Sequence, residues 1–180
     1  MDRSLNIVHL VPGMSDDVLA RGNPCKKCKE ARRRELLRVL SSYKEWKMVT
    51  AHTLSDLIAY TISLLLHSNF NLSNLQPDHR VIEVLSRFYP SLKLESMQII
   101  RPLLNLSERD VSRILSETGI PTIEKCMYSS WRPKRVFFKY LDLFPHTLTY
   151  SELINFLQKH DLPNKFENLI KKIPWTETVL

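Results

Sequence analysis

Three short apolar segments, separated by helical patterns, constrain the fold of this chain more than any other feature. They span residues 5–11, 46–51 and 97–100, and β-branched or large apolar side chains fill most of their positions. Runs of this length, bounded by turn residues such as Pro12-Gly13, are typical of buried strands. Strands that alternate with helices indicate parallel βαβ units, so the sequence predicts an α/β protein with a parallel sheet.

Helical periodicity and helix-end signals predict the elements between and after these strands. The best-marked helix begins at Ser107, which forms a capping-box pattern with Asp110, and it ends at Gly119. The last two predicted helices form a small helical C-terminal tail over 145–180, and residues 1–144 form the main domain. The predicted helices span 25–43, 54–67, 81–88, 107–119, 133–144, 150–160 and 165–173.

The charge balance favours a polyanionic partner. The net charge is +7, the pI is near 9.4, and the basic residues gather in 26–34 and 132–139. A solubilising surface would give the same excess, so charge alone does not choose between the two. The sequence holds neither a long apolar run nor the core of a signal peptide, which predicts a cytoplasmic protein that does not enter a membrane.

The cysteines are the first residues that point to chemistry. Cys25 and Cys28 form a C-x-x-C at the start of a predicted helix, where both sulfurs can face one metal centre. A redox dithiol and two incidental cysteines are the alternatives. Cys126 is the third cysteine, and three thiolates fit a 4Fe–4S cluster with one open iron. Zinc completed by a histidine such as His52, or an ordinary buried thiol at Cys126, would also fit.

Polar residues follow the second and third predicted strands, at the sheet edge where ligands bind in open parallel sheets. His52 and Asp56 follow the second strand and have the groups needed for acid–base chemistry, whereas helix capping would explain Asp56 equally well. Arg101 follows the third strand. Its guanidinium is suited to a phosphate group or the RNA backbone, or to an ion pair with Asp56.

The order of these motifs resembles that of the PP-loop ATPases that thiolate tRNA, the 2-thiocytidine and 2-thiouridine synthesis enzymes. That family has C-x-x-C before an arginine pair, then G-H-x-x-D-D, then R/K-P-L, then a third cysteine after G-I/F-P. Here the order is C-K-K-C with Arg32-Arg33, A-H-T-L-S-D, R-P-L-L, and G-I-P before Cys126. The resemblance covers roughly Leu5 to Phe144.

The resemblance implies a partial Rossmann-like fold of the adenine nucleotide alpha hydrolase type, missing its first β-α-β unit. It implies that Cys25, Cys28 and Cys126 hold a 4Fe–4S cluster whose fourth iron binds the sulfur to be transferred. His52 and Asp56 match the histidine and the second aspartate of G-H-x-x-D-D, and would be catalytic.

The resemblance also implies roles for three arginines. Arg32 and Arg33 match the basic pair that faces the nucleotide or RNA, and Arg101 would bind on the same side. The expected partners are therefore tRNA and a subunit that carries the missing PP-loop; a homodimer is left open.

The chain departs from the family pattern at the ATP site. Ala51 and Ser55 replace the glycine and the first aspartate of G-H-x-x-D-D, and the S-G-G-x-D-S loop does not occur. Adenylation of the base needs that loop to hold the ATP phosphates, so ATP and Mg²⁺ are expected only if a partner supplies it. Truncation and loss of activity are the alternatives. A non-catalytic Fe–S or zinc module that binds RNA, and a zinc protein that binds DNA, are the competing functions.

Overall fold

The computed structural model describes residues 22–94, 97–121, 126–131, 137, 140–141, 148–162 and 164–172. The strand predicted at 5–11 and most of the helix predicted at 133–144 lie outside the described residues. The domain boundary predicted at residue 144 also falls outside them.

The described part of the chain contains a three-stranded mixed sheet, so the predicted α/β class is confirmed. Strand β1 (Trp46–Val49) pairs in parallel with β3 (Met97–Ile100), with Trp46 opposite Met97. Strand β2 (Ser91–Leu94) pairs antiparallel with the other side of β3, which gives the order β1-β3-β2. The predicted parallel pairing therefore holds for β1 and β3, whereas β2, which was not predicted, returns antiparallel beside β3 without a crossover helix.

Helix α2 (Pro24–Leu40) begins where the sequence predicts, because Asn23 Oδ1 accepts a hydrogen bond from Lys26 N at 3.0 Å and proline occupies the first turn. Helix α5 (Glu108–Thr118) begins at the predicted Ser107–Asp110 capping box. It ends at Gly119, whose φ of 65° lies in the left-handed region that glycine adopts without strain.

The remaining elements also follow the predicted positions. Helix α3 (Leu54–His67) follows β1, and α4 (His79–Ser86) precedes β2. Near the C-terminus, α7 (Tyr150–Lys159) and α8 (Glu167–Lys172) match the last two predicted helices. Short 3₁₀ turns occur at Leu72–Asn74, Ser129–Trp131 and Asn164–Phe166.

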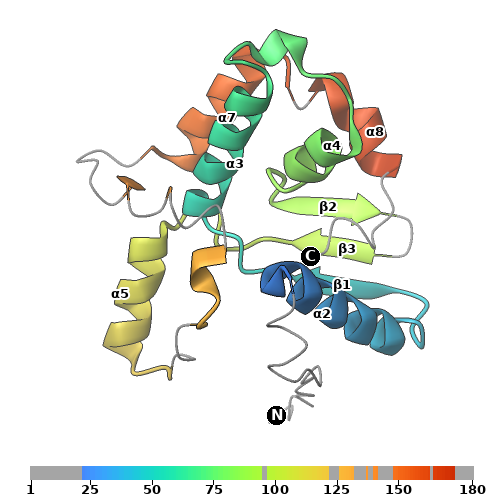
Figure 1. The fold of residues 1–180 in the computed structure, drawn as a ribbon, viewed down its shortest axis with the longest axis vertical. Coiled ribbons are helices and arrows are strands. Elements are labelled where there is room, and N and C mark those ends of the chain that lie inside the picture. Colours follow the sequence, from blue (N-terminus) through green and yellow to red (C-terminus); the bar gives the residue numbers. More distant parts are fainter. Residues whose placement is uncertain are drawn as a thin grey trace, which may run out of the picture.

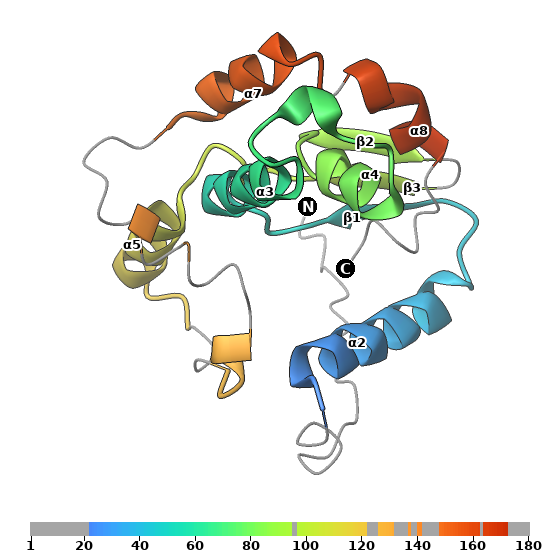
Figure 2. The same cartoon turned by 45° about the horizontal axis from the view of Figure 1, so that its top comes forward.

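The elements form layers (Figure 1). In Figure 2, α2 lies on one side and α7 and α8 on the other, with the strands, α3 and α4 between them. Helix α8 contacts both α4 and β2. Helix α5 lies away from the sheet, and none of its residues is buried.

One hydrophobic cluster joins the sheet to α3, α4, α7 and α8. Its members come from α3, α4, β2, β3, α7 and α8, so the C-terminal helices pack into the same core as the sheet. Burial of this apolar surface is the main favourable term in folding. Among the most deeply buried side chains are Leu57, Leu85, Phe88, Ile99, Leu157, Leu162, Phe166 and Ile170. Within the described ranges, none of the helices combines the length and the apolar character needed to span a bilayer.

Candidate functional site

The C-x-x-C motif lies in the first two turns of α2. Cys25 and Cys28 are half-buried free thiols, and the first turn of the helix contains no acidic residue. Leu36 packs against the core from the same helix, which holds the motif near the body of the protein. Arg32 is exposed and Arg33 is half-buried, so this predicted basic pair is at least partly accessible to a polyanion.

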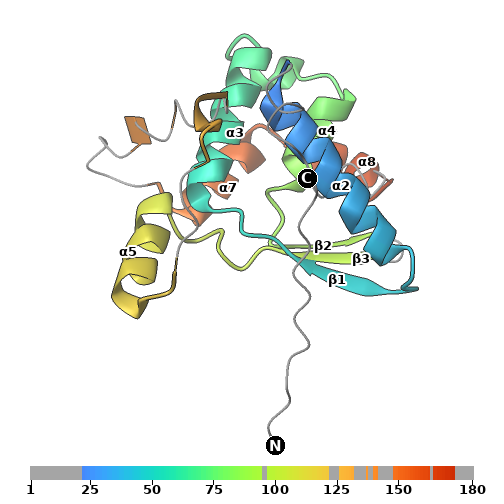
Figure 3. The same ribbon diagram turned by 60° about the horizontal axis from the view of Figure 1, so that its bottom comes forward.

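A contact between α2 and the turn that carries the third cysteine links the two parts of the predicted ligand set. The Cys25 thiol donates to the carbonyl oxygen of Tyr128 at 3.7 Å, although 103 residues separate them. Cys126 lies two residues before Tyr128 and is exposed. Ser129 N donates to the carbonyl oxygen of Cys126 at 2.9 Å, which closes a tight turn. Figure 3 shows this turn, in gold, beside the start of α2.

The chemistry of the donors fits a thiophilic metal centre, because all three thiols are unbridged and their segments adjoin. The side chains do not converge in this conformation. Among the described residues, no three His, Cys, Asp or Glu side chains lie together as one set of metal ligands. A three-cysteine site therefore requires these side chains to lie closer together than they do in this conformation.

The predicted sheet-edge residues do lie on neighbouring strands. Thr50 N donates to the carbonyl oxygen of Ile100 at 3.0 Å, so the segments that carry His52 and Arg101 leave the sheet side by side. His52 Nδ1 lies 3.0 Å from Thr50 Oγ1, and its ring centre lies 6.4 Å from that of Tyr60.

Asp56 forms the cap of α3. Its Oδ2 accepts hydrogen bonds from Thr53 N at 3.0 Å and from Thr53 Oγ1 at 3.3 Å, the arrangement of a capping box. The sequence left this capping role open beside the catalytic one, and the carboxylate makes these contacts in the structure. A second link fixes the same helix end, because Ser55 Oγ accepts a hydrogen bond from Glu108 N at 2.9 Å. The N-termini of α3 and α5 therefore lie next to each other.

Arg101 lies inside the protein, with 2% of its surface exposed. Its Nη1 donates to the carbonyl oxygen of Tyr89 at 2.9 Å, whereas Nε and Nη2 are buried without a hydrogen-bond partner. Burial, and then the nearby positive charge of Arg87, lowers the pKa of Arg101 to about 10. The alternative ion pair with Asp56 is not formed, and a phosphate group would have to enter this buried cluster to reach Arg101.

A second buried arginine lies beside it, and the sequence analysis missed this residue. Arg87 pairs with Glu83 on the same helix, donates to the hydroxyl of Tyr60, and lies 4.8 Å from the centre of the Tyr60 ring. Glu83 also pairs with Lys29 of α2 at 3.4 Å. The only signal in the sequence is the i, i+4 spacing of Glu83 and Arg87, which is common on exposed helices and therefore carries little weight.

No protein-family model matches this chain, and the search of curated proteins found no match either.

Proposed function

We propose that this chain is the iron–sulfur-bearing part of a tRNA 2-thiolation enzyme, and that a partner subunit supplies the PP-loop. The observation that carries the proposal is the contact of Cys25 with Tyr128, because it brings the segment of the third cysteine to the C-x-x-C helix across 103 residues. The order of the sequence motifs supports the same function.

Each group of residues has a proposed role. Cys25, Cys28 and Cys126 bind a 4Fe–4S cluster, which when bound would hold the sulfur to be transferred. His52 handles protons at the sheet edge. The partner subunit binds ATP and Mg²⁺ and adenylates the carbonyl oxygen of the base. That oxygen then leaves with AMP, and sulfur takes its place.

The basic surface of α2 is proposed to bind tRNA. The helix contains seven basic and two acidic residues, among them the predicted pair Arg32 and Arg33. Phosphate contacts of this kind release counterions, so the logarithm of the affinity should fall linearly with the logarithm of the salt concentration. The proposal also includes three further predictions. Arg101 binds a phosphate group, the protein is cytoplasmic, and the chain forms a homodimer.

The first experiment tests the cluster. The chain is reconstituted anaerobically with iron and sulfide, and iron, sulfide and the visible absorbance are measured for the wild type and for Cys126→Ser. We expect a broad charge-transfer band and about four irons per chain in the wild type, and loss of both in a variant that remains folded by circular dichroism. Full iron content in Cys126→Ser would show that Cys126 is not a ligand, and stoichiometric zinc without colour would exclude the cluster.

The second experiment tests the reaction. Thiolated nucleosides are measured by mass spectrometry after incubation of tRNA with ATP, a sulfur donor, the reconstituted chain and a PP-loop subunit. Activity should require both proteins and ATP. If the pair is inactive while the chain still binds tRNA, the enzymatic proposal fails.

A non-catalytic, cluster- or zinc-containing RNA-binding module is the second candidate. Two observations favour it: the Asp56 carboxylate is bound to Thr53 in the helix cap, and Arg101 is turned away from solvent. Asp56→Asn separates the two functions, because an enzyme would lose thiolation and keep tRNA binding. Unchanged turnover in this variant would leave Asp56 with its capping role alone.

A further inference from the structure

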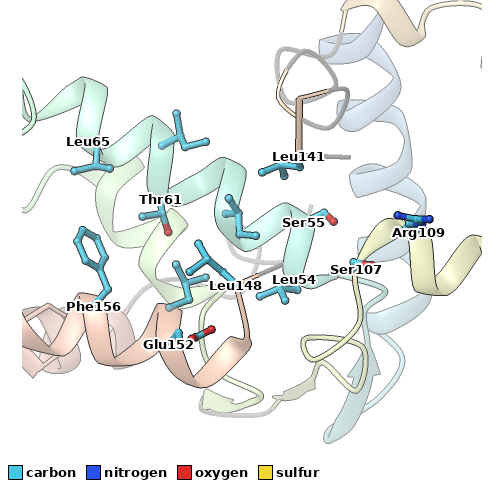
Figure 4. A pocket seen from close by; sticks show the side chains of 13 residues that line it. Leu54, Ser55, Thr61, Leu65, Ser107, Arg109, Leu141, Leu148, Glu152 and Phe156 are labelled. Carbon is cyan, nitrogen blue, oxygen red and sulfur yellow. The ribbon is translucent and has the colours of Figure 1, made fainter. Parts of the chain in front are cut away.

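A cavity of about 450 Å³ lies between α3 and α7, next to the start of α5 (Figure 4). Its size falls within the range of small-molecule sites in proteins. The walls are mainly apolar and come from two helices that the core holds in place. The apolar lining includes Leu54, Ile58, Ile62, Leu65, Leu153 and Phe156.

One end of the cavity is polar. In Figure 4, Leu65 and Phe156 lie at one end of the row of side chains, and Ser55 and Arg109 lie at the other. Ser55 Oγ accepts a hydrogen bond from Glu108 N at 2.9 Å, and its own proton is left to donate. Arg109 is exposed and is the only cationic side chain among the described residues that line the cavity. This end therefore offers a hydroxyl donor and a positive charge.

Two carboxylates near the cavity, those of Glu152 and Asp110, have hydrogen-bond partners within the protein. Glu152 Oε2 accepts hydrogen bonds from Thr149 N at 2.7 Å and from Thr149 Oγ1 at 2.8 Å. Asp110 Oδ2 accepts from Ser107 N at 2.9 Å and from Ser107 Oγ at 2.6 Å. Each carboxylate also lies in the first turn of its helix, where the helix dipole stabilises negative charge. Arg109 is exposed, and its positive charge, which adds to the Ser107 hydrogen bonds in lowering the pKa of Asp110, is accessible to a ligand at this end of the cavity.

We propose that this cavity binds an amphipathic carboxylate, with its apolar chain between α3 and α7 and its carboxylate at Ser55 and Arg109. The apolar walls exclude a nucleotide or a sugar, whose many polar groups would be buried without partners. An uncharged apolar molecule would accept no hydrogen bond from Ser55 and would form no ion pair with Arg109. The proposal is independent of tRNA thiolation, because it involves none of the cysteines and neither His52 nor Asp56.

The test is isothermal titration calorimetry with sodium decanoate as the probe, below its micellar concentration. Octanoate is compared for chain length, and decan-1-ol for the carboxylate. We expect one saturable site per chain, a negative heat-capacity change, roughly fifteenfold weaker binding of octanoate because it lacks two methylenes, and weaker binding of the alcohol.

Three variants locate the site. Arg109→Gln should weaken decanoate binding about tenfold or more, because it removes a charge-assisted hydrogen bond. Arg113→Gln is the matched control, since Arg113 lies one turn further along α5 and does not line the cavity. Ile62→Trp should block the apolar end without loss of helical circular dichroism, because its side chain is only half-buried and faces the cavity.

The outcomes separate clearly. Chain-length dependence together with selective loss in Arg109→Gln and Ile62→Trp would establish the site. Equal effects of Arg109→Gln and Arg113→Gln, equal affinity for decanoate and decan-1-ol, or no saturable binding would each overturn the proposal. None of these results depends on iron, ATP or tRNA, so failure here leaves the thiolation proposal untouched.

Discussion

Lys29 Nζ lies 3.4 Å from Glu83 Oε1, and this ion pair joins the helix that carries the C-x-x-C motif to α4. The same carboxylate oxygen pairs with Arg87, whose side chain is 9% exposed. Removal of the Glu83 charge would therefore loosen α2 and also leave a buried guanidinium without its counter-charge.

We expect Glu83→Gln to lower the free energy of unfolding by about 3 kcal/mol, a typical cost of breaking a buried ion pair. Glu35→Gln is the control, because Glu35 pairs with Arg38 on the solvent-facing part of α2. An exposed pair of this kind contributes less than about 1 kcal/mol. Urea denaturation of both variants gives the comparison, and equal losses would show that the Glu83 pair is no stronger than a surface pair.

Arg101→Met should leave the protein as stable as the wild type or stabilise it by about 1 kcal/mol. The Arg101 guanidinium makes one side-chain hydrogen bond, to Tyr89, and has two buried nitrogen atoms without partners. Replacement of such a group by an apolar chain of similar length removes an unmatched charge from the interior. Arg87→Met should destabilise, because Glu83 and Tyr60 lose their partner. Thermal denaturation of both variants measures these changes in stability. A large loss of stability in Arg101→Met would contradict this explanation.

The cap of α5 should make stability depend on pH. Hydrogen bonds from the Ser107 side chain and backbone hold the pKa of Asp110 below its ordinary value. A carboxyl group with a lowered pKa in the folded state stabilises fully above the pKa of the unfolded chain, and this stabilisation is lost as the pH falls through the folded pKa. Asp110→Asn should therefore be less stable than the wild type near neutral pH. The difference should shrink toward zero as the pH falls through the lowered pKa of Asp110 in the folded state, and a difference that is constant with pH would exclude this origin.

Truncation of Leu157 tests whether the C-terminal helices belong to the core. Leu157 is fully buried, whereas Leu169 of α8 is 42% exposed. Leu157→Ala should cost about 2–5 kcal/mol, and Leu169→Ala considerably less. One cooperative transition in each variant, followed both by tryptophan fluorescence and by circular dichroism, is the expected result. Separate transitions would indicate that α7 and α8 unfold as an independent unit.

The sequence predicted the elements whose ends are marked by local chemistry. Helix α3 follows the predicted bounds, and α5 begins at Ser107 and ends at Gly119, because caps and glycine act over a few residues. Strand β2 was missed, since four residues in S-L-K-L provide too little alternation to distinguish a strand from a loop.

Side-chain environments were harder to predict than elements. The position of Arg101 after a strand suggested a ligand contact, yet its side chain turns inward to Tyr89. The direction depends on neighbours such as Arg87, which are distant in sequence. Asp56 was assigned two possible roles, and its geometry is that of the cap. The contact between Cys25 and Tyr128 supports the predicted convergence of the cysteine segments, although convergence of the three sulfurs stays a prediction.

The shared core has a consequence for synthesis of the protein. Helix α4 contributes Leu85 and Val81 to the same cluster as Phe166 and Ile170, and α8 lies directly against α4. A nascent chain that has emerged from the ribosome only as far as α5 therefore carries apolar side chains that have nothing to cover them. Such an intermediate is prone to aggregate, so early translation products of this protein should be clients of ribosome-associated chaperones until α8 has emerged.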